Sequence, residues 1–464
     1  MLVRGMHSAS HHGTRSDAAA VRRLTVNASV RCRAAWVLAM LLMTAAIPQP
    51  LLGYSALTHE AIVDSAWTDS IKPLLLKKYA GATDDELQEA HAYAYGGCII
   101  QDMGYYPFGS AFFTDLLHYV RSGDFAAALI NDAEPINEYA FALGALEHYI
   151  ADQTGHALAT NEAVPLQFPE LQRKYDSWVT YEDDPVAHLR VEFGFDVLEV
   201  ASGRYTPELN HNLIGFQVAT QLLERTFYKI YGLKVSDVLA NESLAIGTYR
   251  HTVSEIIPEA TKIAWDMKND AIQRALPGIR REQFVYSVSR EAYEQEWGNQ
   301  YERPSWFDKV LAFTLRLIPK YGPISILSVK PPTPETERLF ELSFAASVAR
   351  YRAVLRSLPR ERLTLEDLNL DTGEPARAGA YKLADNTYAE LVHRLQGHYF
   401  ADADPELRDA ILAFYDSAHV PTTTENPEAW RTLEAALAQL RASPPVSLAA
   451  RKSAGESSAP TASQ

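Results

Sequence analysis

FALGALEHYIADQTGHA, residues 141–157, combines apolar residues at helical spacing with three polar residues that recur every four positions. His148, Asp152 and His156 each lie one turn further along a helix, so the three side chains share one face. Apolar residues fill the positions that would bury this helix: Phe141, Leu143, Leu146, Tyr149 and Ile150. Buried polar groups need partners. Imidazole and carboxylate are ligands that zinc selects, and a carboxylate can bridge two ions, so the stretch predicts a buried helix with a metal site.

A plainer interpretation of the same spacing is a buried hydrogen bond between His148 and Asp152, with His156 at the surface near the helix end. The motif H-x3-D-x3-H also arises by chance in a small share of chains of this length. The metal interpretation is favoured because further ligand-type residues elsewhere in the chain extend the series.

The first 53 residues are typical of a signal peptide for export, to the periplasm or as a secreted protein. A basic region ends at Arg33, an apolar run follows up to Pro48, and small residues allow cleavage after Ala46 or after Gly53. An uncleaved membrane anchor is the alternative, because the run itself carries no charge. Pro48 interrupts the run before it reaches the roughly 20 residues of a full span, so cleavage is favoured.

The chain has 464 residues, a formal net charge of -15 and 47% hydrophobic residues, which is enough for one large domain with additions or for two domains. Residues 1–53 contain six Arg and one Asp, so the remainder is more acidic than the whole chain. An acidic body disfavours broad electrostatic binding of nucleic acid, which is therefore the less favoured partner.

Helical patterns dominate from Tyr54 onward and strand-like alternation is scarce, so we predict an all-α fold. The expected helices are 59–67, 84–95, 112–121, 136–152, 188–199, 213–230, 235–239, 254–270 and, after a Pro-rich linker, 335–355. The predicted organisation is a multi-helix domain over 54–270, a helical C-terminal extension over 271–440 and a disordered tail over 441–464. Charges and prolines interrupt the apolar segment Trp306 to Val329, which favours packing against the first domain over a lipid-surface element.

Other ligand-type residues form an ordered series around the central helix. Upstream lie His59, Asp102 and His118, and downstream lies the pair His188 and Glu192. The four-residue spacing of this pair places both side chains on one helical face, where they can hold one ion. The series predicts that ligands from several helices converge on the central one.

The pair His188 and Glu192 is weak evidence by itself. His251/Glu255 and His398/Asp402 have the same spacing, and we expect these two pairs to be ordinary helix surface. Position in the ordered series is what favours His188.

The ordered series resembles the zinc-dependent phospholipase C family, from residue 54 to about residue 203. Its superfamily includes the fungal zinc-dependent single-strand nucleases and the N-terminal domain of glycosylphosphatidylinositol-specific phospholipase D. The resemblance implies an all-α domain that holds about three zinc ions. It implies three ligand sets: Asp102, His118, His148 and Asp152; His156, His188 and Glu192; and His59, a bridging Asp152 and the terminal amino and carbonyl groups of Tyr54.

Two features differ from the family pattern. Tyr54 stands where the mature family members usually begin with Trp, and its amino group is free only if cleavage follows Gly53. His156 follows Asp152 by four positions, as in the phospholipase D branch, whereas the bacillary phospholipases and the nucleases place this histidine further on. The resemblance therefore leaves the choice of substrate more open than the ligands.

Phosphodiester hydrolysis needs a nucleophile at neutral pH and neutralisation of charge on the phosphoryl oxygens, and zinc ions supply both. The resemblance implies that Asp102 orients or deprotonates the attacking water. The aromatic residues Tyr105, Tyr106 and Phe108 follow Asp102 directly and could wall a cleft for a cationic headgroup, acyl chains or a base. Packing of these rings under the metal site is an equal alternative.

We therefore predict an exported zinc-dependent phosphodiester hydrolase, a phospholipase C that releases diacylglycerol and a phosphorylated headgroup. A phospholipase D or a single-strand nuclease on the same zinc cluster is the alternative within the enzyme class. Outside that class the alternative is a non-catalytic, zinc-stabilised binding protein. The expected partner is a phospholipid or another phosphodiester, with contact to a membrane surface as a further expectation, and the oligomeric state is left open.

Overall fold

The computed structural model describes residues 56–106, 108–202, 217–239, 241–251, 281, 332–358, 362–416 and 427–443, the side chains of 197–202, 248–251 and 427 excepted. These residues all lie in the compact unit Gln49–Gln464. The predicted signal peptide, Tyr54, the predicted helix 254–270 and the segment 306–329 lie outside the described residues, and so does the tail beyond 443. Those expectations stay predictions.

The described residues are helical with turns and loops between the helices, and the predicted all-α fold is confirmed. The first group of helices is α2 (Ala56–Ala66), η1 (Trp67–Ile71), α3 (Lys72–Lys78), α4 (Asp84–Ile99), η2 (Ile100–Tyr105), α5 (Ala111–Tyr119), α6 (Ser122–Asp132) and α7 (Ile136–Gly155). There follow η3 (His156–Thr160), α8 (Asn161–Gln167), α9 (Pro169–Tyr175), α10 (Pro185–Ser202), α12 (Thr220–Tyr231), α13 (Val235–Val238) and α14 (Glu242–His251). The C-terminal group is α19 (Pro334–Ser357), α20 (Lys382–Gly397), α21 (Pro405–Asp416) and α22 (Pro427–Ala442).

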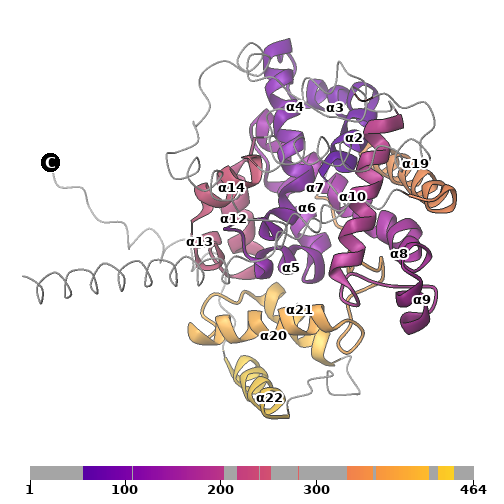
Figure 1. The fold of residues 1–464 in the computed structure, drawn as a ribbon. Coiled ribbons are helices and arrows are strands. Elements are labelled where there is room, and N and C mark those ends of the chain that lie inside the picture. The colour runs from indigo at the N-terminus through magenta and orange to yellow at the C-terminus, as the bar shows by residue number, and fades with distance from the viewer. Residues whose placement is uncertain are drawn as a thin grey trace, which may run out of the picture. The chain divides into compact units, whose positions relative to one another are not determined.

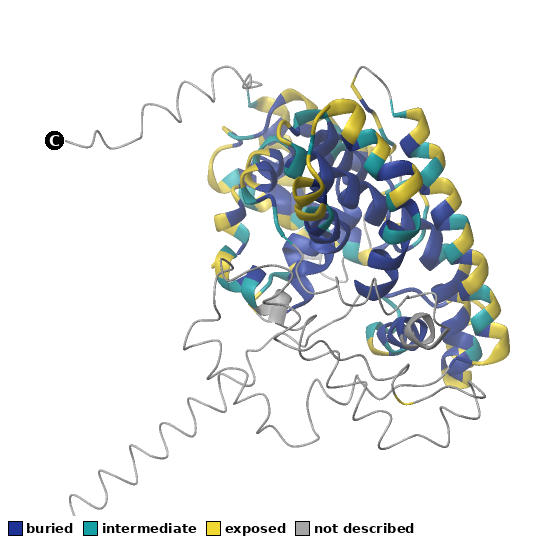
Figure 2. Ribbon diagram, turned by 90° about the horizontal axis from the view of Figure 1, so that it is seen from above, coloured by how far each residue is buried: buried dark blue, intermediate teal, exposed yellow. Residues whose placement is uncertain are grey.

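Helix α7 runs through the middle of the first group (Figure 1) and packs against α4, α6, α2 and α19. Every residue from Glu138 to Gly155 is buried, so the predicted burial of this helix is confirmed. Figure 2 shows the same division for the whole described region, with buried residues where helices face one another and exposed residues on their outer sides. The polar residues of α7 therefore lie inside the protein, where each of them needs a partner.

Close contact between α4 and α7 depends on glycine. A Cβ at Gly97 of α4 would lie 1.9 Å from the carbonyl oxygen of Phe141, and a Cβ at Gly144 of α7 would lie 2.0 Å from that of Ala94. No other residue allows the two backbones to approach so closely. The approach brings the end of α4 beside α7, together with the following turn η2, which carries Asp102.

The predicted helix 213–230 is wrong at residues 217–219, which are not helical, since α12 begins at Thr220. Residues 213–216 lie outside the described residues. The amide of Gln217 instead donates a hydrogen bond to the carbonyl of Ala92, at 2.9 Å. The chain thus crosses α4 before α12 starts.

Five described helices were not expected from the sequence: α3, α6, α8, α9 and α14. Helix α6 is buried at most of its positions, so it lacks the polar face that makes a helical period visible. The others have ten residues or fewer, which leaves little room for a period to repeat.

The C-terminal helices pack on the first group. Helix α19 contacts α7, η3 and α2, α20 contacts α5, and α22 contacts α20. The guanidinium of Arg394 in α20 lies 4.5 Å from the ring centroid of Phe112 in α5. Helix α22 ends at Ala442, slightly past the predicted end of the helical extension at residue 440.

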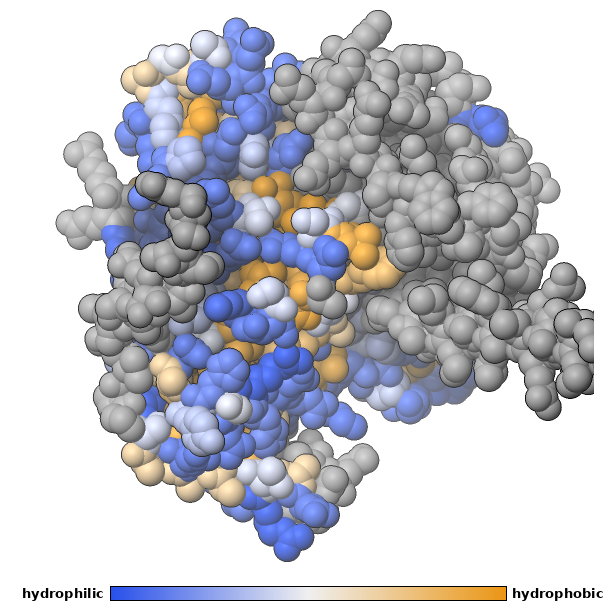
Figure 3. Space-filling model, turned by 90° about the vertical axis from the view of Figure 1, so that its left-hand side faces the viewer, coloured by the Kyte–Doolittle hydropathy of each residue, from blue (hydrophilic) through white to orange (hydrophobic). Residues whose placement is uncertain are grey.

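Apolar residues gather in the middle of the face drawn in Figure 3, with hydrophilic residues beside them. Among the described helices, none combines the length and the apolar composition of a membrane span.

Candidate metal centre

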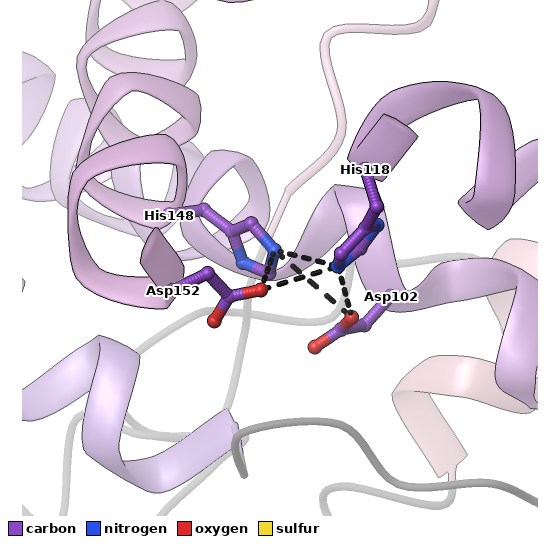
Figure 4. Close-up of side chains that lie close together, drawn as sticks. All are labelled: Asp102, His118, His148 and Asp152. Atoms are coloured by element: carbon purple, nitrogen blue, oxygen red, sulfur yellow. Dashed lines mark hydrogen bonds and ion pairs between the residues drawn. The ribbon is translucent and has the colours of Figure 1, made fainter. Parts of the chain in front are cut away.

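Asp102, His118, His148 and Asp152 converge at one point from three elements, η2, α5 and α7 (Figure 4). One ligand atom from each of the four side chains lies within 4.8 Å of the others. The Nε2 atoms of His118 and His148 are 3.4 Å apart, and both lie close to Asp152 Oδ2, at 3.2 and 3.1 Å. All four side chains are buried, which is the geometry of a cation site rather than of a surface cluster.

The two carboxylate oxygens of Asp152 face different histidines. Oδ2 faces His118 and His148, whereas Oδ1 lies 3.2 Å from Nε2 of His59 and 3.9 Å from Nε2 of His156. Each oxygen of Asp152 would therefore be available to a metal held by the imidazoles that it faces.

His156, His188 and Glu192 form a second group beside the first. Nε2 of His156 and Nδ1 of His188 lie 3.1 and 3.0 Å from the same oxygen, Glu192 Oε1. The two rings meet edge to face with centroids 5.2 Å apart. Helix α10 brings His188 and Glu192 together through their four-residue spacing, and η3 places His156 opposite them.

Four histidines of the cluster turn one ring nitrogen toward a carboxylate of the cluster and the other toward a group outside it: His59, His118, His148 and His188. The outer partners are the carbonyl oxygens of Thr114 for His118 and of Cys98 for His148, both at 2.9 Å. His188 Nε2 lies 2.9 Å from Asn161 Oδ1, and His59 Nδ1 lies 3.1 Å from Glu147 Oε2. These partners are acceptors, so the outer nitrogen carries the hydrogen and the inner lone pair is available to a metal.

The buried polar atoms of the cluster fit a bound cation. Within the described part of the chain, no hydrogen bond of good geometry satisfies Asp102 Oδ1, Asp152 Oδ1, His188 Nδ1 or either carboxylate oxygen of Glu192, although imidazole nitrogens lie within ion-pair distance of three of these oxygens. Buried carboxylate oxygens without a donor are costly unless a cation neutralises them. Imidazole nitrogens and carboxylate oxygens are the donor set of zinc.

The charges of the metal-free cluster are coupled. Burial opposes protonation of His118, but the carboxylates of Asp102 and Asp152 outweigh it and raise the pKa of this histidine to about 10. The pKa of His59 is likewise raised, against the effect of burial, by Glu147 and Asp152. Burial raises the pKa of Glu147 to about 7. Protons thus hold the places that a cation would take, and metal binding must release them.

Several residues that position these ligands were missed from the sequence. Asp196 accepts hydrogen bonds from the amides of Leu57 and Thr58, at 3.2 and 3.1 Å, and so holds the first turn of the helix that carries His59. Asp196 follows Glu192 by four positions, and this periodicity could have identified it. Glu147, Asn161 and Asp371 gave no comparable signal.

The predicted substrate residues differ in exposure. Tyr105 and Tyr106 are buried, whereas Phe108 is 38% exposed. The Tyr105 ring lies beside His118, with centroids 6.2 Å apart, and beside Tyr181, at 5.7 Å. Tyr105 thus borders the cluster directly.

In the equally spaced pair His398 and Asp402, the histidine is exposed and the aspartate is half-buried, with 66% and 26% of the side chains accessible. The pair lies in the turn after α20 and not on a helix as expected, because Tyr399 and Phe400 have positive φ. The side chain of His251 and residue Glu255 lie outside the described residues, and so does the predicted ligand Tyr54.

An all-α scaffold around two adjoining groups of buried histidines and carboxylates defines a candidate metal centre. Residues 58–237 match the family model described as zinc dependent phospholipase C, and this part of the chain is a domain of that family. The matched region contains every predicted ligand except Tyr54. No curated protein and no solved structure gives a significant match to the chain.

Proposed function

We propose that this protein is a zinc phosphodiesterase that acts as a phospholipase C and releases diacylglycerol and a phosphorylated headgroup. The observation that carries the proposal is Asp152, whose two oxygens face separate groups of imidazoles within a zinc-dependent phospholipase C domain. Such a carboxylate suits ions close enough to act on one phosphate. The ligand groups support about three zinc ions if the terminal amine of Tyr54 completes the set around His59.

Zinc, when bound, neutralises charge on the phosphoryl oxygens and lowers the pKa of water. The chain's own residues would hold and orient the reactants. Asp102 Oδ1 lies 3.4 Å from His118 Nε2, within ion-pair distance but without the geometry of a hydrogen bond. We propose that this carboxylate orients the attacking water or takes its proton, a role that requires an acceptor within hydrogen-bond reach of that water.

The bond that breaks depends on which phosphate oxygen lies opposite the nucleophile. Phe108 is 38% exposed and follows Asp102 by six positions, next to the buried rings of Tyr105 and Tyr106, so a headgroup that meets this ring would lie near the water-activating carboxylate. The glycerol oxygen would then point away as the leaving group. This arrangement supports diacylglycerol as the product.

The test is the product mixture from phosphatidylcholine vesicles incubated with purified, metal-analysed protein. Phosphocholine with diacylglycerol is the expected result. Free choline with phosphatidic acid would overturn the phospholipase C assignment in favour of a phospholipase D. Cleavage of single-stranded DNA alone would make the protein a nuclease, and no product from any substrate would favour the non-catalytic binding protein.

Export belongs to the same proposal, because only cleavage after Gly53 frees the amine of Tyr54. Mass spectrometry of exported protein should find Tyr54 at the N-terminus, with elemental analysis giving about three zinc ions per chain. A chain that begins at Ile47, or one that keeps its leader, would leave about two ions.

A further inference from the structure

Asp371 is a buried carboxylate at the metal centre that lies outside the region matched by the family model. Its Oδ1 is 3.4 Å from Nδ1 of His156, a member of the second ligand group. The segment that carries Asp371 connects α19 to α20 and belongs to no helix. A residue from the C-terminal part of the chain thus touches a predicted metal ligand of the N-terminal part.

Hydrogen bonds fasten this segment to the helices that carry the ligands. The amide of Leu370 donates to the carbonyl of His118 at 3.1 Å, and Ser122 Oγ donates to the carbonyl of Leu368 at 2.6 Å. Earlier in the same segment, the carbonyl of Glu366 accepts a hydrogen bond from the hydroxyl of Tyr149 in α7 at 2.7 Å. The position of Asp371 is therefore tied to α5, α6 and α7.

The side chain of Asp371 is held in one orientation. The hydroxyls of Tyr119 and Tyr381 both donate to Oδ2, at 2.8 and 2.5 Å. The backbone carbonyl of Asp371 accepts a hydrogen bond from Asn161 Nδ2 at 2.7 Å, while Asn161 Oδ1 faces His188. Two donors on Oδ2 leave Oδ1 to His156.

Asp371 is placed to act on His156 rather than to bind an ion. Its Oδ1 faces Nδ1 of this histidine, whereas Nε2 faces Glu192 and Asp152. An acceptor at Nδ1 fixes the hydrogen there and leaves the lone pair of Nε2 directed into the second group. A carboxylate partner also makes a ligating imidazole more basic.

We propose that Asp371 is a positioning residue of the second zinc subsite, which fixes the ring orientation and tautomer of His156 for the ion held by His156, His188 and Glu192. The inference rests on the proposed zinc centre. It assigns a task to the C-terminal part of the chain, which supplies this outer partner of His156 from beyond the family region.

The test is zinc affinity in the metal-stripped full-length protein, measured by competition with a chromophoric chelator, with the absorption of bound cobalt as a second readout. Asp371→Leu should weaken one ion of the set by about 10- to 100-fold and leave the others unchanged. Asp371→Asn keeps an acceptor oxygen and should fold if the leucine variant does not, with a smaller loss of about tenfold. The cobalt bands should shift in both variants.

Two further variants separate positioning from simple packing. Asp367→Asn alters a neighbouring carboxylate of the same segment that accepts from the amide of Asp124 at 2.9 Å, and it should keep wild-type zinc affinity whatever its melting temperature. Tyr381→Phe removes one of the two donors that hold Oδ2 and leaves the contact with His156, so its affinity loss should be smaller than that of Asp371→Asn. An affinity loss in Asp367→Asn equal to that in Asp371→Asn would reduce Asp371 to a structural role and overturn the proposal.

Two other outcomes would also overturn it. Loss of one ion that no zinc concentration restores would make Asp371 a direct ligand. Wild-type affinity in both Asp371 variants would refute its action on His156 while leaving the zinc centre intact. A wild-type protein that binds no zinc would instead refute the centre itself.

Discussion

Two His/Asp pairs with the same four-residue spacing lie in different surroundings. His148 and Asp152 in α7 are 0% and 1% exposed, with Nε2 of the histidine 3.1 Å from Oδ2 of the aspartate. His398 and Asp402 after α20 are also within ion-pair distance, at 3.3 Å, but are 66% and 26% exposed. The first pair meets His118 and Asp102, whereas the exposed pair is not part of that cluster. Spacing thus brings two ligand-type side chains together, and convergence of further elements makes the metal centre.

The largest expected effect is that of His148→Ala. Loss of this ligand should abolish turnover and remove zinc, and it should lower the free energy of unfolding by about 3–5 kcal/mol, because buried carboxylates lose their partner. His398→Ala should stay within about 0.5 kcal/mol of the wild type. Denaturant unfolding, elemental analysis and phospholipid turnover measure the difference. Similar behaviour of the two variants would show that burial and convergence do not distinguish the pairs.

Removal of the metal should have the next largest effect. Chelation should lower the free energy of unfolding by about 4 kcal/mol relative to protein with zinc at a thousandfold excess over Kd. Thermal unfolding with and without chelator measures this change. A melting temperature that does not respond to chelator would contradict a structural contribution of the ions.

The stability of the metal-free protein and the affinity for zinc should depend on pH with opposite signs. The pKa of His118 in the metal-free protein is about 10, above the ordinary value of 6.5. Its contribution to stability is therefore complete below pH 6.5 and is lost as the pH rises toward 10. Zinc must displace this proton, so apparent zinc affinity should rise with pH over the same range. Zinc titrations of the metal-free protein at several pH values measure this coupling. A zinc affinity that does not change with pH would contradict it.

The smallest expected effect concerns Asp196, which supports a ligand helix without belonging to the cluster. Asp196→Ala removes the acceptor for the amides of Leu57 and Thr58 and should cost about 1–2 kcal/mol. It should also weaken the ion held by His59, because the first turn of α2 loses its anchor. Asp237→Ala is a matched control, since this exposed carboxylate accepts from the amide of Lys234 at 2.9 Å. Unchanged zinc binding in Asp196→Ala would limit its role to helix stability.

The central helix and the order of the ligand-type residues could be predicted from the sequence because they depend on local periodicity. His148, Asp152 and His156 share a face through helical geometry alone, and the predicted helix 136–152 differs from α7 only at its C-terminal end. Helix boundaries set by long-range contacts could not be predicted. The late start of α12 depends on the crossing of Gln217 over α4, which leaves no mark on the period of the sequence.

The sequence by itself determined the all-α class, the buried face of α7 and the set of ligand types, because each follows from composition and spacing along one helix. Only the tertiary structure decided which of the equally spaced pairs converge and which outer groups hold them. Asp371 shows the reason most clearly. It lies 3.4 Å from His156 across a separation of more than two hundred residues, and such a contact arises from the packing of distant segments, which no local pattern encodes.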